Sequence, residues 1–532
     1  MSTTASSETT RTASGERAWR GAVAGVVSAG AALAFGQLPT AIAGESVGPI
    51  TAVGNEFVDR YAASLKDLAV VLFGQNDKVA LVIGIVTLSL VLGAVLGVLA
   101  LRSFPAAIVG LVIFGAVGLA AQATDPSAGL LLPVISAVIG VAAGVASLAF
   151  QLGWIARPEQ PLAPLRRWGP ADDPRVKTPD RRSFLLASGA VGATAALTGL
   201  GAWSLRGRST IAAQREALVL PQPVRSTPVP RTGTLDADGV SPYLTPTSDF
   251  YRIDTALVTP QVNAESWRLR VTGLVDEPFE LTFDELVGMD LVEEPVTIAC
   301  VSNEVGGDLV GNAAWLGVPL VELLDRAGRQ RDATQVVGRS TDGFTAGFPT
   351  QTALDGRVAL VAVGMNGEPL PASHGYPARL IVAGLYGYVS ATKWLTEIEL
   401  TRFDDFDAYW IPRGWSKLGP IKTQSRIDVP RGGARIESGT VAAAGVAWAP
   451  NVGIAAVEVS VDDGPWEGAD LGASANDNTW VQWVHRWTAE PGEHTLRCRA
   501  TNETGVVQPA ERRDPRPDGA TGHHSVRVTV RT

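Results

Sequence analysis

The chain has 532 residues, which is too long for a single hydrophobic core and predicts about two to four folded units. Its formal net charge of −9 argues against nucleic acid as a partner. Its two cysteines, Cys300 and Cys498, exclude a disulfide framework, a four-cysteine zinc site and an iron–sulfur cluster held by cysteines.

Residues 1–207 predict a membrane domain with about five transmembrane helices. Five apolar runs each approach or exceed the ~20 residues that a helix needs to cross about 30 Å of hydrocarbon. The runs are Ala22–Ala43, Val79–Leu101, Pro105–Ala121, Gly129–Leu152 and Phe184–Leu205. The stretch Phe57–Gly74 is too charged to cross, and it predicts an interfacial or re-entrant helix.

Basic residues in the short loops predict how this domain is oriented. Arg102 lies between the second and third runs, the loop Gly153–Ser183 holds seven basic residues, and the loop "TDPSAG" holds none. This pattern places the N-terminus in the cytoplasm and everything after Leu205 outside it. The adjacent Arg181 and Arg182 resemble a twin-arginine export signal, with an ordinary cytoplasmic helix flank as the alternative.

The rest of the chain divides into three parts. Residues 208–247 are rich in Pro, Ser and Thr and predict an extended linker. Residues 248–426 alternate strand-like runs with short helical turns, which is typical of an α+β domain. Residues 427–532 hold regular short strands with period-two alternation, which predict an immunoglobulin-like β-sandwich with Cys498 facing its core.

Cys300 follows the strand-like residues "VTIA" and precedes a polar, glycine-containing loop. Three interpretations remain open from these residues alone. The thiol is a buried core residue, or a catalytic nucleophile with His374 as the nearest histidine in the sequence, or a ligand to a soft metal. A single cysteine completes such a metal site only when an organic cofactor supplies the other ligands.

Four motifs in this part of the chain resemble the molybdopterin-binding domain of the sulfite oxidase family. They are "FYRID" at Phe250–Asp254, "TIACVSNEVGG" at Thr297–Gly307, "STDGF" at Ser340–Phe344 and the long run "MNGEPLPASHGYPARLIVAGLYGYVSATKWLTEIEL" at Met365–Leu400. The segments "GVAWAP" and "RATNETGVVQP" resemble the C-terminal dimerisation domain of the same family, which implies a homodimer. The resemblance covers about residues 245–530.

The resemblance implies an enzyme that carries a molybdenum–molybdopterin cofactor and catalyses two-electron oxygen-atom transfer on a small sulfur compound. It implies that Cys300 is the protein ligand to molybdenum and that Arg252 lies beside it at the catalytic centre. The residues implied to contact the pterin or its phosphate are Arg252, Asn303, Asp342, His374, Arg379 and Lys393.

The chain departs from the animal and plant sulfite oxidases beside the cysteine. Those enzymes have "CAGNRR", whereas Glu304 stands here at the position of the first arginine. A carboxylate repels a dianion such as sulfite. A reductase that acts on sulfoxide-type compounds therefore remains the alternative within the family.

The resemblance also bears on partners and location. No haem domain is fused in this sequence, so we expect a separate electron carrier, either a cytochrome or a quinone system, alongside membrane lipid. We expect a multi-pass protein of the cell membrane with its catalytic domain on the extracytoplasmic side. Twin-arginine export fits this arrangement, because a domain folded around a cofactor made in the cytoplasm crosses already folded. The alternative from another class is a non-catalytic membrane protein that reuses the fold for binding.

Overall fold

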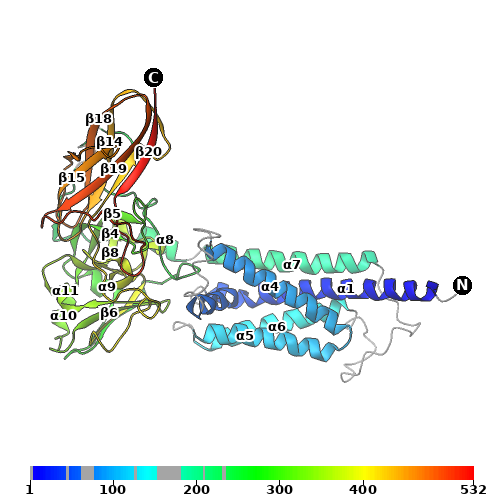
Figure 1. Cartoon of the computed structure of the whole chain (residues 1–532). Coiled ribbons are helices and arrows are strands. Elements are labelled where there is room, and N and C mark those ends of the chain that lie inside the picture. The colour runs from blue at the N-terminus through cyan, green and yellow to red at the C-terminus, as the bar shows by residue number, and fades with distance from the viewer. Residues whose placement is uncertain are drawn as a thin grey trace. The chain divides into compact units, whose positions relative to one another are not determined.

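The computed structural model describes residues 4–43, 47–60, 77–124, 129–152, 181–207, 210–230, 235 and 237–532. The chain forms two compact units. One comprises Met1–Thr210 with Thr255–Gln261, and the other comprises Ile211–Asp254 with Val262–Thr532. Figure 1 labels the helices and strands of both units.

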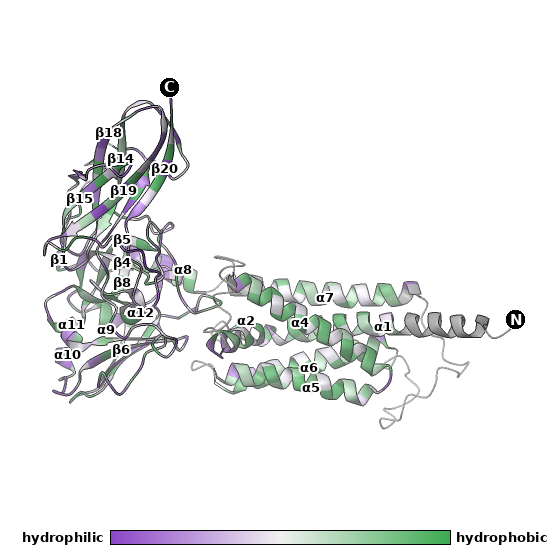
Figure 2. Ribbon diagram, in the orientation of Figure 1, coloured by the Kyte–Doolittle hydropathy of each residue, from purple (hydrophilic) through white to green (hydrophobic). Residues whose placement is uncertain are grey.

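The first unit is helical. Its helices are α1 (Thr4–Gly36), α2 (Leu38–Ala43), α4 (Asp77–Ala100), α5 (Phe104–Ala123), α6 (Leu131–Gln151) and α7 (Arg181–Gly207). Among the described residues, five helical stretches are long and apolar enough to cross a membrane: Ala18–Ala43, Lys78–Ala100, Phe104–Ala123, Leu131–Gln151 and Phe184–Ala202. The five apolar runs of the sequence therefore do fold as helices, and Figure 2 shows how hydrophobic residues dominate α4, α5 and α6.

Small residues and a buried polar network hold these helices together. Gly25 of α1 packs against α4 so closely that an added Cβ atom would overlap the carbonyl of Gly93.

The predicted interfacial helix at 57–74 is described only in part. Its residues 57–60 are helical as part of a helix over 49–60, and the remainder lies outside the described residues. Most of the basic loop after α6 also lies outside them.

The second unit begins with a domain built on two sheets and short helices, as the α+β prediction requires. The first sheet has the strand order β1-β4-β5-β8-β10 with β9 paired to β8, and the second has the order β3-β2-β11-β6-β7. The strands of the first sheet are β1 (Arg225–Ser226), β4 (Val292–Ala299), β5 (Val310–Pro319), β8 (Ala359–Met365), β9 (Glu368–Pro369) and β10 (Arg379–Val382). Those of the second are β2 (Arg268–Gly273), β3 (Phe279–Thr282), β6 (Gln335–Ser340), β7 (Thr345–Pro349) and β11 (Leu395–Thr401). The helices are α9 (Phe283–Val287), α10 (Leu320–Arg326), α11 (Thr350–Leu354), η2 (Ala372–His374) and α12 (Gly387–Ser390).

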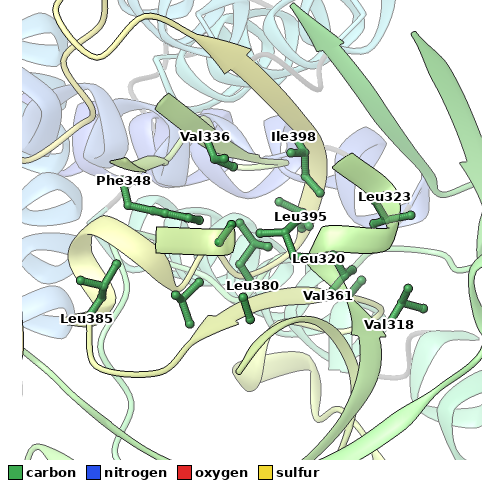
Figure 3. Packing of buried hydrophobic residues seen from close by; sticks show 14 of the residues in the cluster. Val318, Leu320, Leu323, Val336, Phe348, Val361, Leu380, Leu385, Leu395 and Ile398 are labelled. Atoms are coloured by element: carbon green, nitrogen blue, oxygen red, sulfur yellow. The ribbon is translucent and has the colours of Figure 1, made fainter. Parts of the chain in front are cut away.

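A large apolar core fixes this domain. Figure 3 shows side chains from both sheets and from α10 packed together, among them Val361, Leu320, Leu380 and Ile398, all with 2% exposure or less. Burial on this scale is the main stabilising contribution to such a domain, at about 25 cal/mol for each Å² of apolar surface removed from water. The core leaves the polar motif residues at strand ends and in turns.

The described residues of the segment predicted as an extended linker, 211–230, 235 and 237–247, are instead part of the second folded unit. The segment contains α8 (Thr210–Ala217), whose Ile211 is buried, and strand β1, which pairs in parallel with β4. Tyr243 is 1% exposed, and its hydroxyl lies 2.7 Å from the hydroxyl of Thr479. Burial of these side chains outweighs the Pro-rich composition that indicated a free linker.

The C-terminal domain consists of two β-sheets that share a core. One sheet holds β12 (Gln424–Val429), β14 (Gly439–Trp448), β18 (Val481–Ala489) and β17 (Asp470–Leu471). The other holds β13 (Arg435–Glu437), β20 (His524–Arg531), β19 (Gly492–Asn502), β15 (Ile454–Val461) and β16 (Glu467–Gly468). Cys498 is fully buried between the sheets, as the alternation predicts, and Trp483 is fully buried there as well. Strand β12 spans the predicted boundary between residues 426 and 427, so this domain begins earlier than expected; the immunoglobulin-like class stays a prediction.

Candidate functional site

Cys300 follows the last residue of the buried strand β4 and is 8% exposed. Its backbone N–H donates to the carbonyl of Leu309 at 2.9 Å, and its Sγ lies 3.3 Å from the hydroxyl of Ser302. Asn303 is buried, and its Oδ1 accepts a 2.9 Å hydrogen bond from the N–H of Leu309. Asn303 therefore fixes the loop after the cysteine, and Glu304 beside it is exposed.

Two cations of the predicted set share one carboxylate. Arg252 Nε donates to Asp254 Oδ2 at 3.0 Å, and Lys393 Nζ donates to the same oxygen at 3.1 Å. The Lys393 side chain is 9% exposed and that of Asp254 is 5% exposed, whereas Arg252 keeps 42% exposure. Burial lowers the pKa of Lys393 to about 8, and the charge of Asp254 opposes that effect.

His374 and Arg379 lie directly beside this group. Arg379 Nη1 donates to the carbonyl of His374 at 3.1 Å, and its guanidinium lies 5.1 Å from the ring centroid of Trp315. Gly375 between them has a φ of +109°, and an added Cβ would lie 3.1 Å from atoms of both Arg379 and Lys393. Only glycine takes this conformation readily. Because Gly375 has no side chain, Arg379 and Lys393 can approach the turn closely.

The electrostatic environment keeps His374 neutral. Burial is the main cause that lowers its pKa to about 3, and the positive charges of Arg379, Lys393 and Arg252 lower it further. Burial also lowers the pKa of Arg379 to about 10, which leaves it protonated at neutral pH. The site is thus a concentration of positive charge next to an uncharged imidazole.

Asp342 lies in the turn between β6 and β7. Its Oδ1 accepts a hydrogen bond from the N–H of Phe344 at 3.1 Å, while burial raises its pKa. Among the described residues, the buried Asp342 Oδ2 has no hydrogen-bond partner, and the same holds for Nε of Arg379. Buried polar atoms of this kind cost free energy unless a bound molecule satisfies them.

Two tyrosines lie near the thiol, and one of them, Tyr251, also lies near the cationic group. Burial raises the pKa of Tyr251, with the charge of Cys300 as the second cause, and the charge of Arg379 acts in the opposite direction. Burial likewise raises the pKa of Tyr386 to about 12, and the charge of Cys300 contributes to that shift. Tyr251 therefore lies near both Cys300 and Arg379, while Tyr386 lies near Cys300.

Comparison with known proteins identifies the family of this chain. The family described as "Oxidoreductase molybdopterin binding domain" matches residues 256–410. The uncharacterized oxidoreductase YuiH of Bacillus subtilis is 31% identical over 190 residues, which cover 36% of this chain and 92% of YuiH. The chain belongs to the sulfite oxidase family of molybdopterin oxidoreductases.

Two further comparisons show how much of this sulfite oxidase family member is shared with other proteins. Human mitochondrial sulfite oxidase is 28% identical over 316 residues, which cover 50% of this chain and 57% of the human enzyme. The chain thus spans little more than half the length of that relative. Among solved structures, the match to the sulfane dehydrogenase SoxCD from Paracoccus pantotrophus covers 56% of this chain and 87% of the SoxCD chain. The sequence identity is 23% and the TM-score is 0.47. The chain is accordingly an oxidoreductase with a molybdopterin-binding domain.

The residues present fit a cofactor of this sulfite oxidase type. A pterin with a phosphate group is anionic and polar, and Arg252, Arg379 and Lys393 supply positive charge where Asp342 and Arg379 also hold unsatisfied polar atoms. In the part of the chain that the structure describes, no group of three or more His, Cys, Asp or Glu side chains is placed to hold a metal ion. If Cys300 were to hold a metal, an organic cofactor would supply the other ligands.

Two kinds of site residue escaped the sequence analysis. Asp254 and Tyr251 lie inside the motif "FYRID", but only its arginine was named, because nothing in the sequence shows that Lys393 pairs with a carboxylate 139 residues away. Tyr386 lies in the run "AGLYGYVS", where an aromatic residue between glycines indicates core packing as readily as a site. Asp254, Tyr251 and Tyr386 are recognised only in the folded chain, from the charged groups that lie near them.

Proposed function

We propose that this chain is a membrane-anchored molybdenum-cofactor oxidoreductase that catalyses two-electron oxygen-atom transfer on a sulfur compound. One observation carries the proposal. The thiol of Cys300, at the end of a buried strand, and the buried cation Arg379 both act on the charge of Tyr251, and all three lie in or next to the domain that matches the molybdopterin family.

In this proposal Cys300 is the protein ligand to molybdenum. Lys393 and Arg252 neutralise the phosphate of the pterin, and Arg379 Nε and Asp342 Oδ2 each gain the hydrogen-bond partner that they otherwise lack. His374 is neutral and one of its ring nitrogens already has a hydrogen bond to the backbone of Thr247, so the imidazole offers its other nitrogen to the pterin ring. Asn303 holds the loop that follows the thiol.

When bound, the molybdenum centre supplies the two-electron change that accompanies oxygen-atom transfer. The protein contributes binding and orientation. Arg252 is half-exposed while its partner Asp254 is buried, so its guanidinium reaches both the buried group and solvent. We assign it the task of attracting the polar end of the substrate at the catalytic centre.

The substrate class follows from the relatives and from one exposed side chain. The name of the human relative, sulfite oxidase, supports a sulfur compound. Glu304 is exposed three residues before Gly307 and adds negative charge beside the thiol loop. This charge favours a neutral sulfur compound over a dianion, and it is the reason for keeping sulfoxide-type reduction as the second candidate.

The proposed location is the cell membrane, with the catalytic domain outside the cytoplasm and the helical unit as its anchor. The five apolar helices and the basic loops support this arrangement. Electrons pass to or from a separate cytochrome or quinone system, and the C-terminal domain joins two copies as a homodimer.

The test is metal and pterin analysis of the purified full chain, produced in cells that make the pterin cofactor. We expect about one molybdenum and one pterin for each chain, together with either oxidation of sulfite by an artificial acceptor or reduction of a sulfoxide by a reduced dye. A chain that carries neither metal nor pterin overturns the enzyme proposal and leaves the non-catalytic binding protein. Activity on sulfite alone overturns the preference for a neutral substrate.

A further inference from the structure

The C-terminal domain contacts the chain on the N-terminal side of Cys300. Thr297 lies in β4, three residues before the thiol, and its N–H donates to the carbonyl of Asn478 at 2.9 Å. Its hydroxyl accepts a 2.7 Å hydrogen bond from the N–H of Trp480. Asn478 and Trp480 belong to the loop that leads into β18, so a strand of one domain is held by a loop of the other.

The same domain contacts the loop on the other side of the thiol. Nη1 of Arg426, in β12, donates to the carbonyl of Gly307 at 2.7 Å. The rest of this guanidinium is fixed as well, because Nε donates to Asp428 Oδ1 at 2.7 Å and Nη2 donates to the hydroxyl of Ser241 at 3.0 Å. The side chains of Arg426 and Asp428 are each 11% exposed. A planar guanidinium held at three points has a fixed direction, so it determines where the Gly307 carbonyl lies.

A histidine packs against the neighbouring glycine. His524, the first residue of β20, accepts a 3.0 Å hydrogen bond from the N–H of Ile427 at its Nδ1, which fixes the plane of the ring. The imidazole lies directly against Gly306, where an added Cβ atom would overlap ring atoms. Gly306 has a φ of +80° and accepts this approach because it has no side chain.

Hydrogen bonds inside the loop connect this restraint to Cys300. Leu309 accepts from the N–H of Cys300 and donates to Asn303, and the N–H of Asn303 donates to the carbonyl of Cys300 at 3.1 Å. Residues 300–309 thus form one closed hydrogen-bonded loop. A side chain that holds Gly307 in place also limits how far the thiol moves.

We propose that the C-terminal domain positions Cys300, with Arg426 as the positioning residue and with His524 and the Thr297 contacts as its support. The proposal deepens the proposed function, since its purpose rests on Cys300 bonding a metal. A metal ligand gains from such support, because residues that orient the ligand set the strength of its bond. The domain is then a working part of the site, in addition to any role in joining two copies.

The test measures the reactivity of Cys300 in the full chain purified from cells that cannot make the pterin cofactor. A small alkylating reagent is applied, and mass spectrometry of the peptides separates labelling of Cys300 from that of the fully buried Cys498. Loss of one charge-assisted hydrogen bond changes a local opening equilibrium by about 10-fold or more. We expect Arg426→Met to raise the alkylation rate of Cys300 by about that factor.

Arg499→Met is the matched control. Arg499 Nε donates to Glu458 at 2.7 Å within the C-terminal domain, which makes it a similar ion pair on strands β19 and β15. We expect this variant to leave the rate within about twofold of the wild type, since a twofold change lies well below the loss of one such bond. Equal rates in Arg426→Met and wild type, or equal increases in both variants, overturn the proposal.

Arg426→Lys covers the case in which the methionine variant does not fold. A lysine keeps the charge but has no planar fork, so it does not hold three partners at once. The rate should still rise, and an unchanged rate overturns the positioning role. Because no metal is present in this experiment, its outcome is separate from the proposed function, which fails only if cofactor-competent cells yield a chain without molybdenum.

Discussion

Lys393 and Asp254 form a buried ion pair with an Nζ–Oδ2 distance of 3.1 Å, and the two residues lie 139 positions apart in the chain. Asp254 also accepts from Arg252, so a single carboxylate balances two cations that would otherwise repel each other. Removing one partner of a buried pair leaves an uncompensated charge, which is far more costly than losing an exposed pair.

We expect Asp254→Asn to lower the free energy of unfolding by about 3 kcal/mol and to lower the pKa of Lys393 further. The measurement is thermal unfolding of the full chain in detergent. Asp407→Asn is the control, because Asp407 pairs with Lys417 at 2.8 Å but is 54% exposed, and an exposed pair is worth less than about 1 kcal/mol. Similar effects of the two substitutions would contradict the role of the buried pair.

The lowered pKa of His374 predicts a loss of stability in acid. Its folded pKa of about 3 lies below the unfolded value of 6.5, so between these values the unfolded chain binds a proton that the folded chain does not. Stability contributed by this group therefore falls as pH decreases from 6.5 towards 3, by about 2 kcal/mol at pH 5. The melting temperature of the wild type should fall more steeply between pH 7 and pH 5 than that of His374→Gln.

The pKa of His494 is shifted in the opposite direction to that of His374, so His494 serves as the control. Its hydrogen bond to Asp462, at 2.6 Å, is the main cause that raises its pKa. Stability from His494 is therefore complete below 6.5 and is lost as pH rises through its folded pKa. If substitutions of His374 and of His494 changed the pH dependence of the melting temperature in the same way, burial of His374 would not be the cause.

Cys300→Ser should abolish activity and remove the thiolate-to-metal absorption band, while the fold and the bound pterin remain. Serine keeps the size of the side chain but replaces the soft sulfur ligand with a hydroxyl. Activity assays, absorption spectra and pterin analysis measure the three quantities. Cys498→Ala should keep full activity, because Cys498 lies in the core of the C-terminal domain. Full activity of Cys300→Ser would remove the ligand assignment.

Gly306→Ala should destabilise the chain more than Gly505→Ala does. Both glycines have a φ of +80°, so both substitutions bring the same backbone strain of about 1 kcal/mol. Only at Gly306 does the new Cβ meet the ring of His524, while the space beside Gly505 is open. Thermal unfolding compares the two, and equal losses would mean that His524 moves aside without cost.

Ser188→Ala should weaken the packing of α7 in the helical unit. The Ser188 hydroxyl donates to Gln151 at 2.9 Å, and Gln151 donates to Ser147 on α6 at 2.9 Å. Interhelical hydrogen bonds in membranes contribute about 0.6 kcal/mol on average and up to about 1.7 kcal/mol. Thr194→Ala on the same helix is the control, because the Thr194 hydroxyl donates to the carbonyl of Ala190 within α7 and has no interhelical bond to another described residue. In mild detergent, Ser188→Ala should lower the stability of the full chain to unfolding, and Thr194→Ala should leave it unchanged.

The sequence by itself determined the elements that depend on local pattern. Apolar runs long enough to span a bilayer became helices, as at Lys78–Ala100, because length and composition suffice for that prediction. Alternation placed Cys498 in the core of a β-domain, and the motif around Cys300 put the thiol at a strand end. Each of these depends on neighbours within a few residues.

Only the tertiary structure decided how distant groups meet. It placed Asp254 between Arg252 and Lys393, turned the Pro-rich segment around Tyr243 into part of the folded unit, and brought Arg426 and His524 onto the loop after Cys300. No local pattern encodes these pairings, because a charge or hydrogen-bond partner is chosen by proximity in space. The contents of the site were therefore partly predictable from motifs, while its balance of charge and its support from the second domain were not.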